Sequence, residues 1–175
     1  MCRDKDKGIE TNMQYIVLDL EWNQAPSREK TVTTPVRLSG EIIQIGAVRV
    51  SEAGEILETL KCDVRPRHYT QMHYKIREIT GITSAQLRRG IPFETAYRQL
   101  ADFVGTDSVF LTWGPGDLPM LRTNMALYGY APEWLPRSYD LQLIFNAAHI
   151  RARRQCSLAA PLELLHIEQS PNMHP

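Results

Sequence analysis

The sequence lacks an excess of charge of either sign, a cysteine framework and any long apolar run. Twenty basic residues balance twenty acidic ones in a chain of 175 residues. A general coat for nucleic acid is therefore absent, and any polyanion must be bound locally. The three cysteines (Cys2, Cys62 and Cys156) are odd in number and lack metal-ligand spacing, which indicates reduced thiols in a cytoplasmic protein. Nothing resembles a signal peptide, and no apolar run approaches membrane-spanning length.

The length and the ordinary composition predict one folded domain. Hydrophobic residues make up 43% of the chain and charged residues 23%, which is enough apolar material for a sizeable core. Residues 1–12 are polar and are expected to form a flexible N-terminal arm. The folded domain is expected to occupy 13–175, and the sequence contains no internal repeat.

The stretch Tyr15–Trp22 organises the rest of the chain. It is an apolar, β-prone run that ends in two acids, Asp19 and Glu21. Because side chains alternate along a strand, the two carboxylates share one face. Apolar residues on both faces predict a central, covered strand. Neighbouring carboxylates repel each other unless a cation or hydrogen-bond donors stabilise the charges. These residues alone leave a metal site and a solvent-exposed strand end equally open.

The hydrophobic patterns downstream predict an α/β fold with a mixed sheet and helices on both of its faces. Alternation over 41–50 and 56–64 predicts a second and a third strand, and helical spacing over 93–104 predicts an amphipathic helix. Three sequential strands followed by alternating helices and strands are typical of such a fold. Further elements are expected at 109–113 (strand), 118–128 (helix), 138–145 (a short element) and 157–165 (a last helix capped by Ser157), with a short helix around Leu87 capped by Thr83 or Ser84.

A third acid, Asp117, follows a predicted strand and a Gly-rich turn and opens a helix. Taken alone, it is either a helix N-cap or a ligand. Acids at the carboxyl ends of different strands are how an α/β sheet assembles a site. Ligand sets made only of oxygen favour Mg²⁺ or Mn²⁺ over zinc. The loop 23–40 leaves directly from the acidic pair and is expected to border the same site.

Four motifs that occur in family order make the sequence resemble the DEDDh 3′-to-5′ exonucleases, the superfamily of ribonuclease T, oligoribonuclease and polymerase proofreading subunits. The motifs are Asp19-Leu20-Glu21, the strand 41–48, Thr80-Gly81-Ile82 and Trp113-Gly114-Pro115-Gly116-Asp117. The last motif is most similar to the branch that trims structured RNA 3′ ends. The resemblance runs from about Met13 to the last residue and implies a ribonuclease-H-like fold.

The resemblance also implies the roles of individual residues. Asp19, Glu21 and Asp117 would hold two Mg²⁺ or Mn²⁺ ions, Glu21 would take part in catalysis, and His174 falls where the family's general base belongs. Leu20, Trp22 and Trp113 adjoin these acids and are the candidate substrate-binding residues. The two tryptophans would stack on a terminal base, with core packing as the equal alternative.

The function that the resemblance implies is metal-dependent hydrolysis at the 3′ end of single-stranded nucleic acid, with RNA favoured over DNA. The alternatives are a catalytically impaired nucleic-acid-binding module and a DNA proofreading or repair exonuclease. The family's fourth acid would lie five residues beyond His174, so the domain is expected to be incomplete at its C-terminus, without the last helix. No membrane partner is expected, and nothing in the sequence indicates an oligomeric state.

Other polar residues are weaker candidates. Asp140 is expected to make a structural bond or a helix cap. The cluster Arg151–Arg154 is either a solvated helix face or a phosphate contact. Four histidines lack ligand spacing and are expected to be surface or hydrogen-bonded residues, namely His68, His73, His149 and His166.

Overall fold

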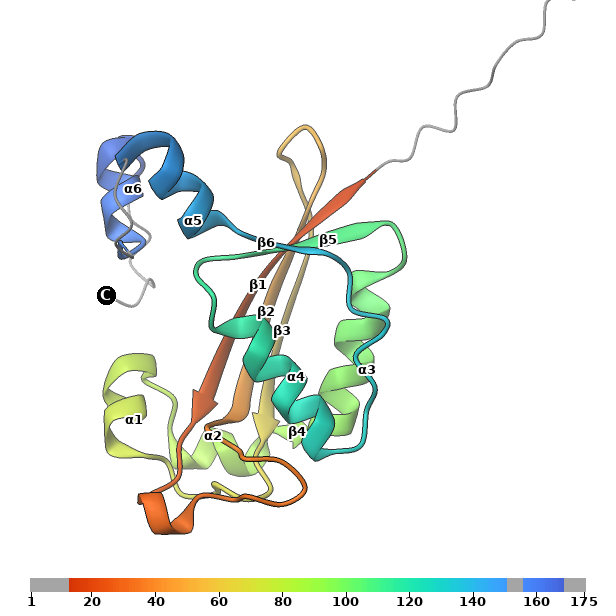
Figure 1. The fold of residues 1–175 in the computed structure, drawn as a ribbon, viewed down its shortest axis with the longest axis vertical. Coiled ribbons are helices and arrows are strands. Elements are labelled where there is room, and N and C mark those ends of the chain that lie inside the picture. Colours follow the sequence, from red (N-terminus) through yellow and green to blue (C-terminus); the bar gives the residue numbers. More distant parts are fainter. Residues whose placement is uncertain (1–12, 151–155, 169–175) are drawn as a thin grey trace, which may run out of the picture.

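The structure is a computed structural model that describes residues 13–150 and 156–168. Its centre is a six-stranded sheet with the strand order β4-β3-β2-β1-β5-β6 (Figure 1). The expected arm 1–12, the cluster Arg151–Arg154 and His174 all lie outside the described residues.

The sheet is mixed, as the sequence predicts. The first three strands form an antiparallel meander, whereas β5 runs parallel to β1, β6 parallel to β5, and β4 parallel to β3. The predicted central position of β1 is confirmed, because β2 and β5 pair with its two edges. The strands are β1 (Gln14–Asn23), β2 (Glu41–Val50), β3 (Ile56–Arg65), β4 (Ile91–Pro92), β5 (Ser108–Thr112) and β6 (Ser138–Asp140).

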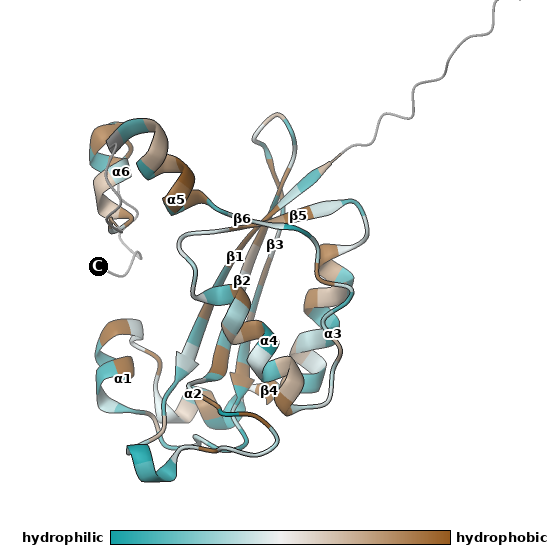
Figure 2. Cartoon of the chain, viewed as in Figure 1, coloured by the Kyte–Doolittle hydropathy of each residue, from teal (hydrophilic) through white to brown (hydrophobic). Residues whose placement is uncertain are grey.

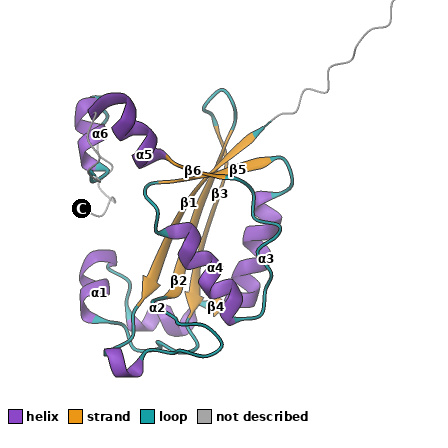
Figure 3. Cartoon of the chain, in the orientation of Figure 1, coloured by secondary structure: helices purple, strands orange, loops and turns teal. Residues whose placement is uncertain are grey.

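The helices lie on both sides of this sheet (Figure 3). They are α1 (Tyr74–Thr80), α2 (Ser84–Arg89), α3 (Phe93–Val104), α4 (Asp117–Leu127), α5 (Leu141–Phe145) and α6 (Ala159–Leu164), with a 3₁₀ turn, η1 (Arg28–Lys30), and a π turn, η2 (Asn146–Ile150). In the described part of the chain, none of these helices is long and apolar enough to cross a membrane.

Two helix starts test the predicted caps. Thr83 caps α2 with a full capping box, in which the Thr83 side chain accepts from the Gln86 N–H. The prediction for Ser157 is wrong, because α6 begins at Ala159 with Leu158 in the N-cap position and no side-chain cap. Ser157 contributes only its backbone carbonyl, which accepts from the N–H of Ala160 at 3.2 Å.

The main core lies between one face of the sheet and helices α3 and α4. Ile16, Leu18 and Leu20 of β1 are buried there, as the alternation along the strand predicts. Leu100 of α3 and Leu121 of α4 close over them and are themselves fully buried. Figure 2 shows hydrophobic colouring on the strands of the sheet and on parts of both helices. This packing fixes α4, whose first residue is Asp117, against β1.

The opposite face of the sheet is covered unevenly. A register shift after Glu21 leaves Ile43 without a partner in β1, and Ile43 packs with Ile82 and Leu87 in a second cluster beneath α1 and α2. Farther back along β1, Val17 is 38% exposed. The prediction of a strand covered on both faces is therefore wrong for this part of β1, because α1 and α2 reach only its carboxyl end. Asp19 and Glu21 lie where that cover begins.

Candidate active site

Asp19 and Glu21 lie at the carboxyl end of β1, on the face turned away from the main core. In the antiparallel pairing with β2 they stand opposite Gly46 and Gln44. Asp19 is exposed and Glu21 is half-buried. The structure thus confirms the shared face that the i, i+2 spacing predicts.

Asp117 is the first residue of α4, and its carboxylate reaches back to β1. Its Oδ1 accepts a hydrogen bond of 3.0 Å from the backbone N–H of Leu20, the residue between the two acids of β1. Asp117 is 8% exposed. Gly116 occupies the N-cap position of α4 and no side chain caps the helix. The helix-cap alternative for Asp117 is therefore wrong, and α4 instead brings a third carboxylate to the acidic pair.

Burial and neighbouring charges raise the pKa values of Glu21 and Asp117. Burial, followed by the charges of Asp19 and Asp117, raises the pKa of Glu21 to about 7. Burial and the charge of Asp19 raise the pKa of Asp117 to about 6, although the N–H groups of Leu20 and of Asp117 itself act in the opposite direction. At neutral pH the site therefore carries negative charge that is incompletely stabilised, which is the condition under which a cation binds.

These residues fit a hard divalent cation in their chemistry. All three supply carboxylate oxygens, and Mg²⁺ is commonly bound by one or two carboxylates, with waters and substrate phosphates completing its shell. Within the described ranges, no three His, Cys, Asp or Glu side chains are grouped closely enough to form a ligand set by themselves. A bound ion would therefore use Asp19, Glu21 and Asp117 in part, and other oxygen ligands for the rest.

A buried side chain of α4 and a half-buried one just after it fasten the helix, and hence Asp117, to the start of β2. Asn124 is fully buried, accepts from the N–H of Ile42 at 3.0 Å and donates to the carbonyl of Gly40 at 3.1 Å. The hydroxyl of Tyr128 donates to the buried carboxylate of Glu41 at 2.9 Å. These contacts leave no local pattern in the sequence, because the partners in each pair lie more than 80 positions apart.

The predicted substrate-binding residues lie around the acids in different settings. The side chain of Leu20 is buried in the main core. Trp22 also packs against the core, and its ring lies against Gly40 and Gly116. Trp113 follows β5, donates from Nε1 to the carbonyl of Cys156 at 3.3 Å and lines an apolar cavity of about 390 Å³ between α5 and α6. Contact with a substrate stays a prediction for all three.

Two further predictions concern the surroundings of the site. Asp140 is a structural residue as expected, because its Oδ1 caps α5 at the N–H of Leu143 and also accepts from the N–H of Gly114. The loop 24–40 starts where β1 ends and is pinned by Tyr69, whose hydroxyl accepts from Val32 and donates to the carbonyl of Leu38. That this loop borders the site stays a prediction.

Comparison with protein families gives a match to the exonuclease family of the RNase_T model, over residues 17–175. Among curated proteins, the chain is similar to a probable 3′-5′ exonuclease, KapD, of Bacillus subtilis (strain 168), with 26% identity over 123 residues. The match covers 70% of this chain and 57% of that protein. The matched segment thus spans little more than half the length of the curated relative.

Solved structures share the fold. The nuclease domain of 3′hExo, described as a DEDDh family member bound to rAMP, gives a TM-score of 0.76 at 22% identity, covering 92% of this chain and 84% of that one. A 3′-exonuclease in 3′-end-specific recognition of histone mRNA stem-loop gives a TM-score of 0.74 at 22% identity. The match covers 92% of this chain and 74% of that one. Cell-death related nuclease 4 gives a TM-score of 0.72 at 17% identity, and the match covers 92% of this chain and 58% of that one.

Proposed function

We propose that this chain, which belongs to the exonuclease family whose model matches residues 17–175, is a metal-dependent nuclease that removes nucleotides from the 3′ end of single-stranded nucleic acid. The observation that carries the proposal is the approach of Asp117 to the acidic pair of β1, close enough for its charge to raise the pKa of Glu21. Asp19 and Glu21 share a face of β1, and Asp117 is bound to the backbone between them at 3.0 Å.

The electrostatics of the site support a role for divalent cations. The pKa of Glu21 is raised to about 7 and that of Asp117 to about 6, in part by the charge of Asp19. A cation beside these groups would relieve the repulsion that raises both pKa values. We therefore assign Asp19, Glu21 and Asp117 to the binding of Mg²⁺ or Mn²⁺.

Hydrolysis of a phosphodiester needs an activated water and stabilisation of the charge that develops on the leaving oxygen. In nucleases, bound divalent ions activate the water and also stabilise the charge on the leaving oxygen. The chain's part is to hold the carboxylates in place: β1 positions two of them, and the Leu20 N–H keeps Asp117 beside the pair. His174, which we assign as the base that accepts the proton of the water, lies outside the described residues.

We further propose that RNA is preferred to DNA. The supporting facts are the Trp-Gly-x-x-Asp form of the motif that ends in Asp117 and the ligands of the structural neighbours, one bound to rAMP and another to histone mRNA stem-loop. Degradation of matched RNA and DNA oligonucleotides at equal enzyme concentration tests this preference. Faster loss of the DNA would favour a proofreading or repair exonuclease.

A second candidate function is a nucleic-acid-binding module with impaired catalysis. One observation favours it: in the part of the chain that the structure describes, no three acidic, histidine or cysteine side chains form a metal-ligand group. Such a module would bind oligonucleotides with or without a divalent ion and would release no nucleotides.

Nucleotide release from a labelled oligonucleotide separates the two candidates. The wild type is expected to release nucleotides in Mg²⁺ or Mn²⁺ and to stop when EDTA is added. Asp19→Asn is expected to lose the activity, whereas Asp102→Asn, which removes an exposed acid from α3, keeps it. Activity that survives in Asp19→Asn would refute the proposed site, and a wild type that binds without release would favour the binding module.

A further inference from the structure

One segment of this neutral chain carries a clear excess of positive charge. Residues 65–89 contain six basic residues and a single acid, Glu78, a formal net charge of +5 in a chain whose total is zero. We infer that this basic segment binds the phosphodiester backbone of the strand whose 3′ end enters the candidate site, an inference that rests on the proposed function. Its basic members are Arg65, Arg67, Lys75, Arg77, Arg88 and Arg89.

The six basic side chains are open to a ligand. All six are exposed, and among the residues that the structure describes none of them forms an ion pair with a carboxylate. The two helices of this segment, α1 and α2, cover the same face of the sheet that carries Asp19 and Glu21. Exposed charges of one sign beside a cleft attract polyanions and hold them by exchange for counterions.

Hydrogen bonds fasten the basic segment to β1, the strand that carries Asp19 and Glu21. The side chain of Asn23, two residues beyond Glu21 and fully buried, donates to the carbonyls of Tyr69 (2.7 Å) and Gln71 (2.8 Å) and accepts from the N–H of His73 (2.9 Å). These bonds set the start of α1 at the carboxyl end of β1. The segment is therefore placed relative to the acids by backbone contacts, which a mobile basic tail would lack.

The buried carboxylate of Glu41 organises the preceding part of the segment. It accepts from the N–H groups of Arg67 (2.6 Å), His68 (2.9 Å) and Tyr69 (2.7 Å). Hydrogen bonds from backbone N–H groups to a carboxylate are stronger than those between neutral groups. The turn after β3 is thus held in one conformation, with the side chains of Arg67 and His68 on the surface.

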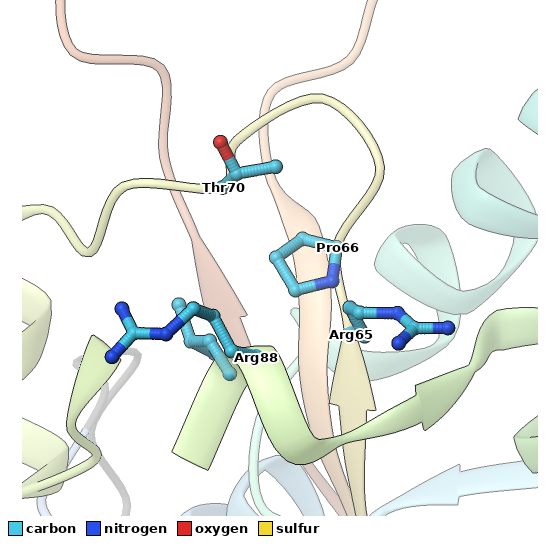
Figure 4. Close-up of a pocket in the computed structure, with 5 residues that line it drawn as sticks. Arg65, Pro66, Thr70 and Arg88 are labelled. Atoms are coloured by element: carbon cyan, nitrogen blue, oxygen red, sulfur yellow. The ribbon is translucent and has the colours of Figure 1, made fainter. Parts of the chain in front are cut away.

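A cavity of about 280 Å³ lies within the basic segment, lined by Arg65, Pro66, Thr70, Leu87 and Arg88. Figure 4 shows the side chains of Arg65 and Arg88 on opposite sides of this cavity, with their guanidinium groups directed away from each other. The two arginines therefore do not converge on one anion. They suit separate phosphates along a strand, with the apolar wall between them facing a sugar or a base.

The register of the sheet indicates how far this contact lies from the acids. Glu21, Gln44 and Asp63 are aligned across β1, β2 and β3, and Arg65 follows Asp63 by two residues. With strands about 4.8 Å apart and about 3.3 Å per residue, the backbone of Arg65 lies roughly 12 Å from that of Glu21. A stacked strand advances about 3.4 Å per nucleotide, so the contact is expected roughly three to four nucleotides from the 3′ end.

The test is the salt dependence of binding to a labelled single strand of about twelve nucleotides, measured by fluorescence anisotropy in EDTA, where hydrolysis stops. Arg65→Gln/Arg88→Gln is expected to weaken binding several-fold and to reduce the slope of log Kd against log salt by about 1.4, or about 0.7 per lost contact. The matched control Arg98→Gln/Arg122→Gln removes two exposed charges from α3 and α4, behind the other face of the sheet, and is expected to keep the wild-type slope.

A second variant, Lys75→Gln/Arg77→Gln in α1, keeps the test valid if Arg65→Gln/Arg88→Gln fails to fold. It is expected to reduce the slope of log Kd against log salt in the same way. A strand of about three nucleotides should bind the wild type and Arg65→Gln/Arg88→Gln alike, since it is too short to reach Arg65. Equal slopes in both basic-segment variants and in the control, or no binding of the longer strand by the wild type, would overturn the inference. The basic-segment variants could show the reduced salt slope while the wild type releases no nucleotides in Mg²⁺. That result would support the inference and refute the proposed nuclease activity.

Discussion

The backbone N–H of Leu20 donates to Oδ1 of Asp117 at 3.0 Å, across 97 positions of the sequence. Leu20 is the residue between Asp19 and Glu21, so this single bond joins the acidic pair of β1 to the first residue of α4. A hydrogen bond from an N–H to a carboxylate favours its charged form, which partly opposes the effect of burial on Asp117. The bond therefore helps to keep the third carboxylate ionised beside the other two.

Asp117→Asn is expected to separate metal binding from folding. The amide oxygen can still accept from Leu20, but the charge is lost, so the affinity for Mn²⁺ measured by calorimetry should fall at least tenfold, about 1.4 kcal/mol. Asp19→Ala should lower the affinity in the same way. With EDTA present, Asp117→Asn should melt no lower than the wild type, because a buried charge has been removed. Wild-type affinity for Mn²⁺ in both variants would show that the metal site is misplaced.

The stability of the metal-free protein is expected to fall as the pH rises. The folded-state pKa of Glu21 is raised from 4.5 to about 7, and that of Asp117 from 3.8 to about 6. Folding therefore favours the protonated forms, and the stability they contribute is present at low pH and lost as the pH passes through about 6 to 7. Melting in EDTA between about pH 5 and pH 8 should show this loss in the wild type.

Glu21→Gln is the matched control for this pH dependence, since it removes the more strongly shifted group at nearly constant shape. Its melting temperature should change less with pH than that of the wild type. Saturating Mg²⁺ should also flatten the wild-type profile, because a bound cation stabilises the charged carboxylates. A wild type and a Glu21→Gln variant with parallel profiles in EDTA would contradict the electrostatic description of the site.

Asn124→Ala is expected to destabilise the fold by roughly 2–4 kcal/mol. The substitution leaves the N–H of Ile42 and the carbonyl of Gly40 without their side-chain partner in a fully buried position, at about 1–3 kcal/mol for each group. Thr123→Ala is the control on the same helix, because it removes only a hydrogen bond to the carbonyl of Pro119. Urea unfolding of the two variants measures the difference, and equal midpoints would show that Asn124 does not fasten α4.

Much of the fold could be predicted because the relevant patterns are local. Helical spacing of apolar residues gives α3 with the bounds Phe93–Val104, and alternation gives β2 as Glu41–Val50. The acidic pair could be predicted for the same reason, since the i, i+2 spacing on a strand fixes a common face. Helix α1 was missed, because Tyr74–Thr80 spans only two turns and buries just Thr80.

The remainder of the site depends on contacts that no local pattern records. Asp117 follows a turn that also suits a helix cap, and only its hydrogen bond with Leu20 across the fold places its carboxylate beside the acidic pair. Asn23 and Glu41 resemble ordinary polar residues at strand ends, yet both are buried and bind backbone groups 26 to 50 positions away. The extra residue Ile43, which turns to the second face, depends on the pairing of two strands and has no signature of its own.

The most direct measurement of the central claim is the product pattern from a 5′-labelled linear single strand and from a circle of the same sequence, each incubated with Mg²⁺. A nuclease that acts from a free 3′ end shortens the linear strand one nucleotide at a time and leaves the circle intact. A 3′-phosphate should slow the reaction, because it adds negative charge beside Asp19, Glu21 and Asp117. A stepwise ladder with a surviving circle is the predicted result, and rapid cutting of the circle would show that the protein is an endonuclease.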